Sequence, residues 1–233
     1  MNKAALKDNW HGEADCVNCP IRKSVLFAGL EPLECEHLHR AIDNFSLPQH
    51  SALYRAGEPA QCLFTVRSGL LKLVQYLPDG RQRIVRLLRD TDVTGLEALL
   101  GQTYQHDAIV LQQAEFCRLP LDLVQRLDRE NPKLHRELMT RWQRALVEAD
   151  SWLTQLATGS ARARMARLLL RLSSSGGHPC TLLGREDMGA MLGITTETAS
   201  RIIAEFRRGG MIRDADGDTV QCDMAALEVV AAN

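Results

Sequence analysis

The 233-residue sequence predicts an α+β protein, in which an N-terminal antiparallel β-roll is followed by a long helix and a smaller, mostly helical domain. Short runs of β-forming residues, separated by turns that contain glycine, occupy residues 45–119, and strands at such spacing are typical of antiparallel rolls and sandwiches. From residue 120 onward apolar residues recur at helical spacing instead, and the longest such pattern covers residues 133–156.

We expect the chain to divide into a cysteine-bearing leader (1–29), the β-roll (30–131), a long helix (132–158) and a C-terminal domain (159–233). Residues 31–44 are predicted to form a short helix, because Pro32 suits a first helical turn and apolar residues follow at helical spacing. The roll contains a predicted hairpin turn at Leu77–Arg81, where Gly80 supplies a positive φ. A further helix is expected to begin near Pro120 and to break at Asn131.

The long helix carries an apolar seam with spacings of 4, 3, 4, 3 and 4 residues, which is the pattern of a two-stranded coiled coil. The seam residues are Leu138, Trp142, Ala145, Ala149, Trp152 and Leu156. We therefore predict a dimerisation helix, the alternative being a helix that packs only within its own subunit. A second stripe, Leu146 and Leu153, is expected to face the chain's own β-roll, and Thr158–Ser160 to form a hinge.

The formal charge of -1 excludes a protein that is basic from end to end, but the charge is unevenly distributed. Residues 159–213 contain nine Arg and four acidic residues, a local net charge of +5, whereas residues 214–233 contain five acidic residues and no base. A nearly neutral chain thus carries a basic segment that suits nucleic acid. No apolar run is long enough to span a membrane, and the first residues lack a secretory signal, so we expect a cytoplasmic protein.

Residues 183–212 have the spacing of a helix-turn-helix: a short helix near 185–192, a turn at Gly193, and a second helix capped by Thr195 or Thr196. The second helix has an apolar stripe made of Ala199, Ile202, Ile203 and Phe206. Strands around 211–213 and 219–221 are expected to form a two-stranded wing. The alternative is a helical pair that serves stability alone.

Polar residues on the first turn of the second helix are the candidates for reading double-stranded DNA. Arg201 suits guanine, Glu197 suits the amino group of cytosine, and Ser200 suits several bases. The full set of candidate DNA-binding residues is Thr196, Glu197, Ser200, Arg201, Arg207 and Arg208, of which the last two suit phosphates.

This order of β-roll, apolar-seamed helix and winged helix-turn-helix resembles the CRP/FNR superfamily of bacterial transcription regulators over essentially the whole chain. The segment Gly189-x3-Gly193-x-Thr195-x-Glu197-Thr-x-Ser200-Arg201 looks like the recognition helix of the FNR branch, whereas the catabolite-activator branch would have Arg in place of Thr196. The resemblance implies a cyclic-nucleotide-binding-like roll, a homodimer and TTGAT-like half-sites. It also implies RNA polymerase as a partner if the protein is an activator.

The resemblance also bears on the effector. Cyclic-nucleotide-binding members hold the phosphate with an arginine, but this sequence has His106-Asp107-Ala108 at that point, after Gly95-Leu-Glu97. An aspartate there would repel a cyclic phosphate, which argues against cyclic AMP.

Members of the FNR branch sense oxygen with an iron-sulfur cluster held by four cysteines, and three positions match here: Cys16, Cys19 and Cys117. The third leader cysteine of the branch falls at Val25, so the fourth ligand is unknown; the candidates are Cys62, Cys35 and His11. The alternatives are a thiol switch between Cys16 and Cys19, a haem, or a sensor without a cofactor.

An enzyme is not indicated, because the chain lacks a phosphate-binding loop, a nucleophile elbow and an HExxH motif. The different-class alternative, a thiol oxidoreductase built on the lone CxxC of Cys16 and Cys19, lacks the βαβ pattern that such proteins have.

Overall fold

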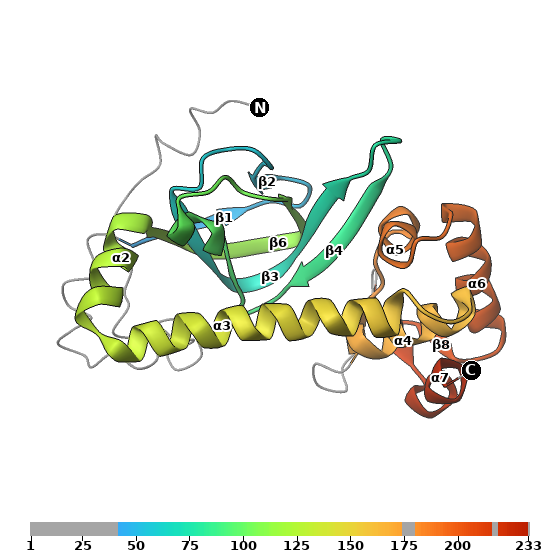
Figure 1. Cartoon of the computed structure of the whole chain (residues 1–233). Helices are drawn as coiled ribbons and strands as arrows, with labels where there is room; N and C mark the ends of the chain where they lie inside the picture. Colours follow the sequence, from blue (N-terminus) through green and yellow to red (C-terminus); the bar gives the residue numbers. More distant parts are fainter. Residues whose placement is uncertain (1–41, 174–179, 216–218, 233) are drawn as a thin grey trace. The chain divides into compact units, whose positions relative to one another are not determined.

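The computed structural model describes residues 42–173, 180–215 and 219–232, which divide into two compact units (Figure 1). Among these residues, the first unit holds 42–74 and 86–146, and the second holds 75–85 and 147–232. No helix in the described part of the chain is long and apolar enough to cross a membrane.

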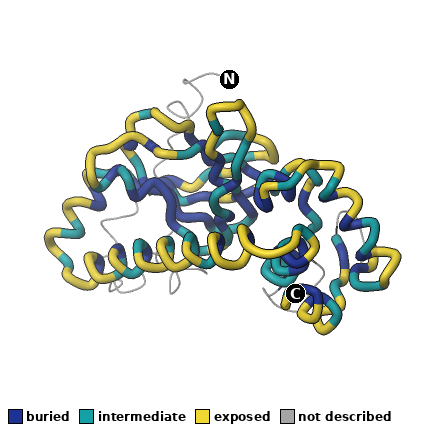
Figure 2. Tube along the Cα trace, turned by 45° about the vertical axis from the view of Figure 1, so that its right-hand side comes forward, coloured by how far each residue is buried: buried dark blue, intermediate teal, exposed yellow. Residues whose placement is uncertain are grey.

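The first unit is an antiparallel roll, as predicted. Its strands are β1 (Asp43–Leu47), β2 (Ala52–Tyr54), β3 (Cys62–Tyr76), β4 (Gln82–Leu88), β5 (Val93–Thr94) and β6 (Asp107–Pro120). The sheet order is β1-β6-β3-β4, with β2 on β6 and β5 on β3. The long strands β3 and β6 carry most of the buried residues, as the dark segments of Figure 2 show.

Aromatic side chains fill the interior of the roll. The rings of Tyr54 and Tyr104 stack with centroids 3.9 Å apart, and those of Phe45 and Phe116 lie 5.4 Å apart. Close contact between β3 and β6 requires Gly69, because a Cβ there would lie 2.5 Å from the carbonyl oxygen of Gln113. The roll therefore has a densely packed core.

The short helix predicted for 31–44 is wrong at its end, since Asp43 and Asn44 lie in β1; residues 31–41 lie outside the described part of the chain. Asp43 pairs with Arg118 across the sheet and forms a buried ion pair with it, Oδ2 to Nη2, at 2.6 Å. This contact with a residue far along the chain overrides the local helical pattern.

The helices that follow the roll begin and end close to where the sequence places them. They are α2 (Leu121–Glu130) and α3 (Pro132–Ser151), and a π-helix, Trp152–Leu156, continues α3. The 3₁₀-helix η2 (Leu96–Leu100) lies within the roll, between β5 and β6, and the sequence patterns did not predict it. The predicted break at Asn131 is confirmed: its backbone is extended, and its side-chain oxygen accepts a hydrogen bond from Lys133 N at 2.9 Å.

The rotation of α3 about its axis differs from the prediction. Leu146 and Leu153, expected to face the roll, are 57% and 66% exposed, so that expectation is wrong. Leu134, Leu138 and Arg141 are buried instead. Arg141 lies on the buried face because its guanidinium donates to the carbonyl of Thr91 at 3.0 Å. The sequence pattern assigns a charged residue to the exposed face of the helix, so it predicts a different rotation.

The predicted seam of α3 is divided between buried and half-buried positions within the chain. Leu138, Trp152 and Leu156 are buried, whereas Trp142, Ala145 and Ala149 are half-buried.

The second unit contains the expected helix-turn-helix and wing. Its elements are α4 (Ala161–Ser173), β7 (Cys180–Thr181), α5 (Arg185–Leu192), α6 (Thr196–Arg208), β8 (Ile212–Asp214), β9 (Thr219–Cys222) and α7 (Met224–Ala231). The wing is a three-stranded sheet of order β7-β9-β8, and α7 packs on α4. The sequence patterns did not predict the strand β7 or the helix α7.

Candidate nucleic-acid interface

The turn between α5 and α6 depends on two glycines. Gly193 ends α5 with φ +63°, in the left-handed region that favours glycine. Gly189 lies beneath the turn, where a Cβ would be 2.8 Å from the carbonyl oxygen of Ile194. Both glycines are therefore needed for α5 and α6 to meet as they do.

The first turn of α6 is held by its N-cap. Thr195 Oγ1 accepts a hydrogen bond from Thr198 N at 3.2 Å. Hydrogen bonds from the backbone of Glu197 and from the Thr195 hydroxyl hold the pKa of the Glu197 carboxyl below its usual value. Glu197 therefore stays ionised at neutral pH and keeps its capacity to accept hydrogen bonds.

The helix α6 separates an apolar face from a polar one, as predicted. Ala199, Ile202, Ile203 and Phe206 are buried. The six candidate DNA-binding residues are all exposed: Thr196, Glu197, Ser200, Arg201, Arg207 and Arg208. The described structure thus leaves the predicted reading face of α6 open to solvent.

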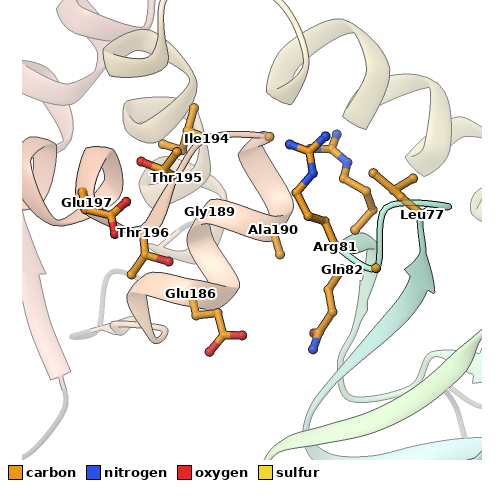
Figure 3. Close-up of a pocket in the computed structure, with 13 residues that line it drawn as sticks. Leu77, Arg81, Gln82, Glu186, Gly189, Ala190, Ile194, Thr195, Thr196 and Glu197 are labelled. Atoms are coloured by element: carbon orange, nitrogen blue, oxygen red, sulfur yellow. The ribbon is translucent and has the colours of Figure 1, made fainter.

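A cleft of about 710 Å³ lies in the second unit, and two of these six side chains, Thr196 and Glu197, line it (Figure 3). Thr196, Glu197 and Glu186 border it, together with Arg81 of the turn between β3 and β4 and Gln82 at the start of β4. The beginning of α6 therefore faces open space within this unit.

The last turn of α6 is linked to the wing. Arg207 donates to Asp214 Oδ1 from Nη2 at 2.6 Å and from Nε at 3.1 Å. Arg185, at the start of α5, lies near Arg207. Burial lowers the pKa of the Arg185 guanidinium, and the positive charge of Arg207 lowers it further. Arginines from α5 and α6 therefore gather around one wing carboxylate.

The arginines of α4 bind within the chain. Arg162 pairs with Glu205 at 2.7 Å, and Arg164 donates to the carbonyl of Leu192. Arg167 and Arg171 bind groups near the end of the long helix, described below. The basic character predicted for residues 159–213 is thus partly used in intramolecular contacts, which a charge count does not reveal.

Cys117, the cysteine matched in the roll, lies half-buried on β6. Its Sγ donates to Asn44 Oδ1 at 3.2 Å, and Arg67 Nη1 lies 3.9 Å from the sulfur. The sulfur of Cys117 therefore lies between an amide oxygen and a guanidinium.

The strand register separates Cys62 from Cys117. Thr65 pairs with Cys117, and Cys62 lies three residues before Thr65 with no bulge between them, so the two thiols point to opposite faces of the sheet. Burial raises the pKa of the Cys62 thiol. Among the described residues no three ligating side chains form a metal site, and Cys16, Cys19, Cys35 and His11 lie outside the described residues.

Asp107 is a buried carboxylate with two partners in the chain. Its Oδ2 accepts from Arg55 Nη1 at 2.6 Å, and its Oδ1 accepts from the backbone N of Ala56 at 2.8 Å. The segment expected to hold a phosphate thus presents an anion that fixes a neighbouring loop.

Two domain families match the chain in the order that the geometry suggests. Residues 44–131 match the cyclic nucleotide-binding domain, and residues 163–230 match the Crp-like helix-turn-helix domain. The chain belongs to the CRP/FNR superfamily of transcription regulators. Proteins of this superfamily bind DNA through the helix-turn-helix and are not enzymes, so the candidate interface on α6 belongs to a DNA-binding regulator.

Relatives of this CRP/FNR regulator include a transcriptional activator and a regulatory protein of fumarate and nitrate reduction. The chain is 26% identical over 216 residues to the transcriptional activator protein anr of Pseudomonas aeruginosa, covering 89% of this chain and 88% of the relative. It is 24% identical to the fumarate and nitrate reduction regulatory protein of Vibrio cholerae, covering 84% and 82%.

Solved structures agree with the fold. A CRP-family transcriptional regulator of Thermus thermophilus superposes with a TM-score of 0.71 at 28% identity, over 81% of this chain and 97% of that one. FixK2 of Bradyrhizobium japonicum shares the fold, with a TM-score of 0.74 at 23% identity, over 82% and 98%.

Proposed function

We propose that this CRP/FNR regulator binds two-fold symmetric DNA with TTGAT-like half-sites as a homodimer, and that oxygen, redox state or a related diatomic gas changes its affinity. The exposed first turn of α6 carries the DNA-reading part of this proposal. There Glu197, Ser200 and Arg201 project from a helix whose opposite face is buried. Their side-chain chemistry matches base edges of the major groove. If the protein is an activator, RNA polymerase is its further partner.

An exposed apolar stripe on the long helix supports the homodimer. Met139, Leu146 and Leu153 recur at intervals of seven residues and are 44%, 57% and 66% exposed, with Val147 beside them. A heptad repeat of this kind is covered by a second helix in a coiled coil. Trp142, Ala145 and Ala149 of the predicted seam are half-buried and adjoin this stripe.

The sensor proposal rests on the relatives and on Cys117. Two relatives are anaerobic regulators by name, and Cys117 has an arginine beside its sulfur. We propose an iron-sulfur cluster held by Cys16, Cys19, Cys117 and an unidentified fourth ligand; such a cluster supplies reactivity toward oxygen. A Cys16/Cys19 thiol switch and a haem are the alternatives, and the bound carboxylate of Asp107 argues against cyclic AMP.

DNA reading is tested by fluorescence anisotropy with a TTGAT palindrome and a scrambled duplex. Arg201→Ala should cost about 1–3 kcal/mol on the palindrome and relax specificity at one base pair. Arg208→Ala should weaken binding to both duplexes equally, because phosphate contacts carry no sequence information. Equal losses on both duplexes for Arg201→Ala would contradict its base-reading role.

The sensor is tested on protein purified without oxygen, by its visible spectrum and its iron and sulfide content. Broad visible absorption with labile sulfide supports the cluster, and a Soret band supports haem. A colourless protein without iron leaves the thiol switch or a sensor without a cofactor. Cys117→Ser should abolish the absorption of a cluster, whereas Cys62→Ser, the matched roll cysteine on the other face, should retain it.

A further inference from the structure

The segment after the long helix, which contains the predicted hinge Thr158–Ser160, is held in place by hydrogen bonds within the chain. After the π-helical turn Trp152–Leu156, Gly159 turns the chain with φ +83°. The hydroxyl of Thr154 donates to the carbonyl of Asp150 at 2.9 Å, and that of Thr158 donates to the carbonyl of Thr154. The two hydroxyls thus donate to backbone carbonyls near the point where the α-helical hydrogen bonding ends.

Arg167 of α4 joins three parts of the chain through backbone carbonyls. Its Nη1 donates to Gln155 O at 2.9 Å and to Thr158 O at 2.8 Å, and its Nε donates to Ala231 O at 2.8 Å. One guanidinium therefore ties the end of the long helix and the turn after it to the last turn of α7. Gly159 adjoins this group, since a Cβ there would lie 3.4 Å from Arg167 Nη2.

Arg171 makes a second attachment one helical turn later on the same face of α4. Its Nη1 donates to Ser151 Oγ at 3.0 Å, and its guanidinium lies 5.8 Å from the centroid of the Trp152 ring. Trp152 and Leu156 are buried. The second half of α4 is thus held to the end of the long helix at two successive turns.

The position of α4 is transmitted to α6 through direct contacts. Arg164 donates to the carbonyl of Leu192 at the end of α5, whereas the pair of Arg162 with Glu205 of α6 is solvent-exposed and contributes little to this link. The helix α4 also packs against both α5 and α6. A change in the direction of α4 therefore moves the reading face of α6 with it.

We propose that Arg167 is a positioning residue for DNA reading, because it fixes the direction in which α4, and with it α6, continues from the last turns of the long helix. The inference rests on the proposed function, since a dimer reads two half-sites together only when its recognition helices keep a set separation. Loss of the Arg167 guanidinium should make the separation of the two recognition helices less fixed, without removing any group that we propose to contact DNA.

We call the hydrogen bonds from Arg167 to the carbonyls of Gln155, Thr158 and Ala231 the clamp. The clamp is tested without DNA, by hydrogen–deuterium exchange. Arg167→Met keeps the length of the side chain but removes all donors, and it should speed exchange of peptides covering 152–160 by about 3- to 10-fold. Arg167→Lys keeps the charge but lacks the planar fork, so it should speed exchange as well. Arg162→Met, on the same helix, removes a charge without touching the turn and should leave these peptides unchanged.

The positioning role is tested with TTGAT palindromes whose spacer is shortened or lengthened by one base pair, which moves the half-sites by about 3.4 Å. Wild type should prefer one spacer, and the preference should fall about 3- to 10-fold in Arg167→Met and Arg167→Lys but stay in Arg162→Met. Because lysine keeps the charge, a loss of spacer preference in Arg167→Lys reports geometry and not electrostatic attraction.

Gly159→Ala leaves Arg167 intact but strains the turn, because its φ of +83° disfavours a side chain, so it should reproduce the loss of spacer preference. Faster exchange at 152–160 with an unchanged spacer preference would overturn the positioning role. Unchanged exchange in Arg167→Met would overturn the clamp. A wild type that binds no palindrome would instead contradict the proposed function, and the exchange data would still report on the clamp.

Discussion

Asp43 and Arg118 form an ion pair that is almost completely closed off from water, with side chains 2% and 8% exposed. Asp43→Ala leaves the guanidinium buried without its carboxylate, so we expect a loss of about 3–5 kcal/mol in the free energy of unfolding. The double variant Asp43→Leu/Arg118→Met replaces both charges with apolar groups and should lose much less. Urea unfolding of both variants measures the difference.

The exposed pair Arg162–Glu205 serves as the control for this prediction, because its side chains are 44% and 43% exposed. Glu205→Gln should change the free energy of unfolding by less than about 1 kcal/mol. If Asp43→Ala destabilised the protein no more than Glu205→Gln does, the buried pair would have no special role.

His106 should make the roll sensitive to mild acid. Burial lowers its pKa from the usual 6.5, while Glu97 partly opposes this shift and Arg86 adds to it. The unfolded chain therefore binds a proton at His106 at a higher pH than the folded chain does. Above pH 6.5 the titration of His106 does not reduce the free energy of unfolding. This free energy falls as the pH drops from 6.5 toward the lowered pKa.

The measurement is the thermal unfolding midpoint at pH 7.5 and pH 5.5. His106→Gln removes the titrating group, so the variant should lose less on acidification than the wild type does. An equal loss in both proteins would assign the acid sensitivity to other groups.

Single residues differ in how far the sequence predicts their roles. The exposure of Glu197, Ser200 and Arg201 was predictable, because it follows from a local pattern in one helix. The contacts of Arg164 and Arg167 were not, because their acceptors are backbone carbonyls, of which Leu192 O lies 28 residues from Arg164 and Ala231 O lies 64 residues from Arg167. A carbonyl is present at every residue, so no sequence signal marks these acceptors.

At the scale of elements, the exposed stripe of α3 predicts where the dimer forms. Leu146→Glu places a charge in the middle of this stripe, and a helix from a second copy would bury it. We expect the dimer affinity to fall at least about tenfold, since burial of an unpaired charge costs several kcal/mol. The folded monomer should remain, because Leu146 is exposed within its own chain. Analytical ultracentrifugation with circular dichroism separates these outcomes.

Val229→Glu on α7 is the matched control, since Val229 is also an exposed apolar residue, at 67%. It should leave the dimer intact. A dimer that survives Leu146→Glu but dissociates in Val229→Glu would move the interface from α3 to α7.

Elements also differ in predictability for a physical reason. The α5–α6 pair and its turn were predictable, because glycines, an N-cap and a periodic stripe all lie within one short segment. The rotation of α3 was not, because it depends on Arg141 reaching a carbonyl of the roll. Strand β7 was missed because its two residues carry no periodicity and are defined only by pairing with β9.

At the scale of the whole molecule, the order of roll, long helix and helix-turn-helix was predictable, because each part has its own period of apolar residues. Charge was a weaker guide. The total of -1 conceals a basic segment, yet the arginines of α4 in that segment bind inside the protein. The number of basic residues therefore overstates the number of cations that DNA meets.

Because the arginines of α4 bind within the chain, we expect the affinity for DNA to depend only weakly on salt concentration. If Arg207 and Arg208 of both subunits each neutralise one phosphate, the slope of log K against log salt should be about −4. Contacts from Arg162, Arg164, Arg167 and Arg171 in addition would bring it to about −11. Titrations of the TTGAT palindrome between 50 and 300 mM KCl measure the slope, and Arg208→Ala should reduce its magnitude by about 2. Arg162→Met should leave it unchanged; a slope near −11 that falls in Arg162→Met would place α4 on the DNA.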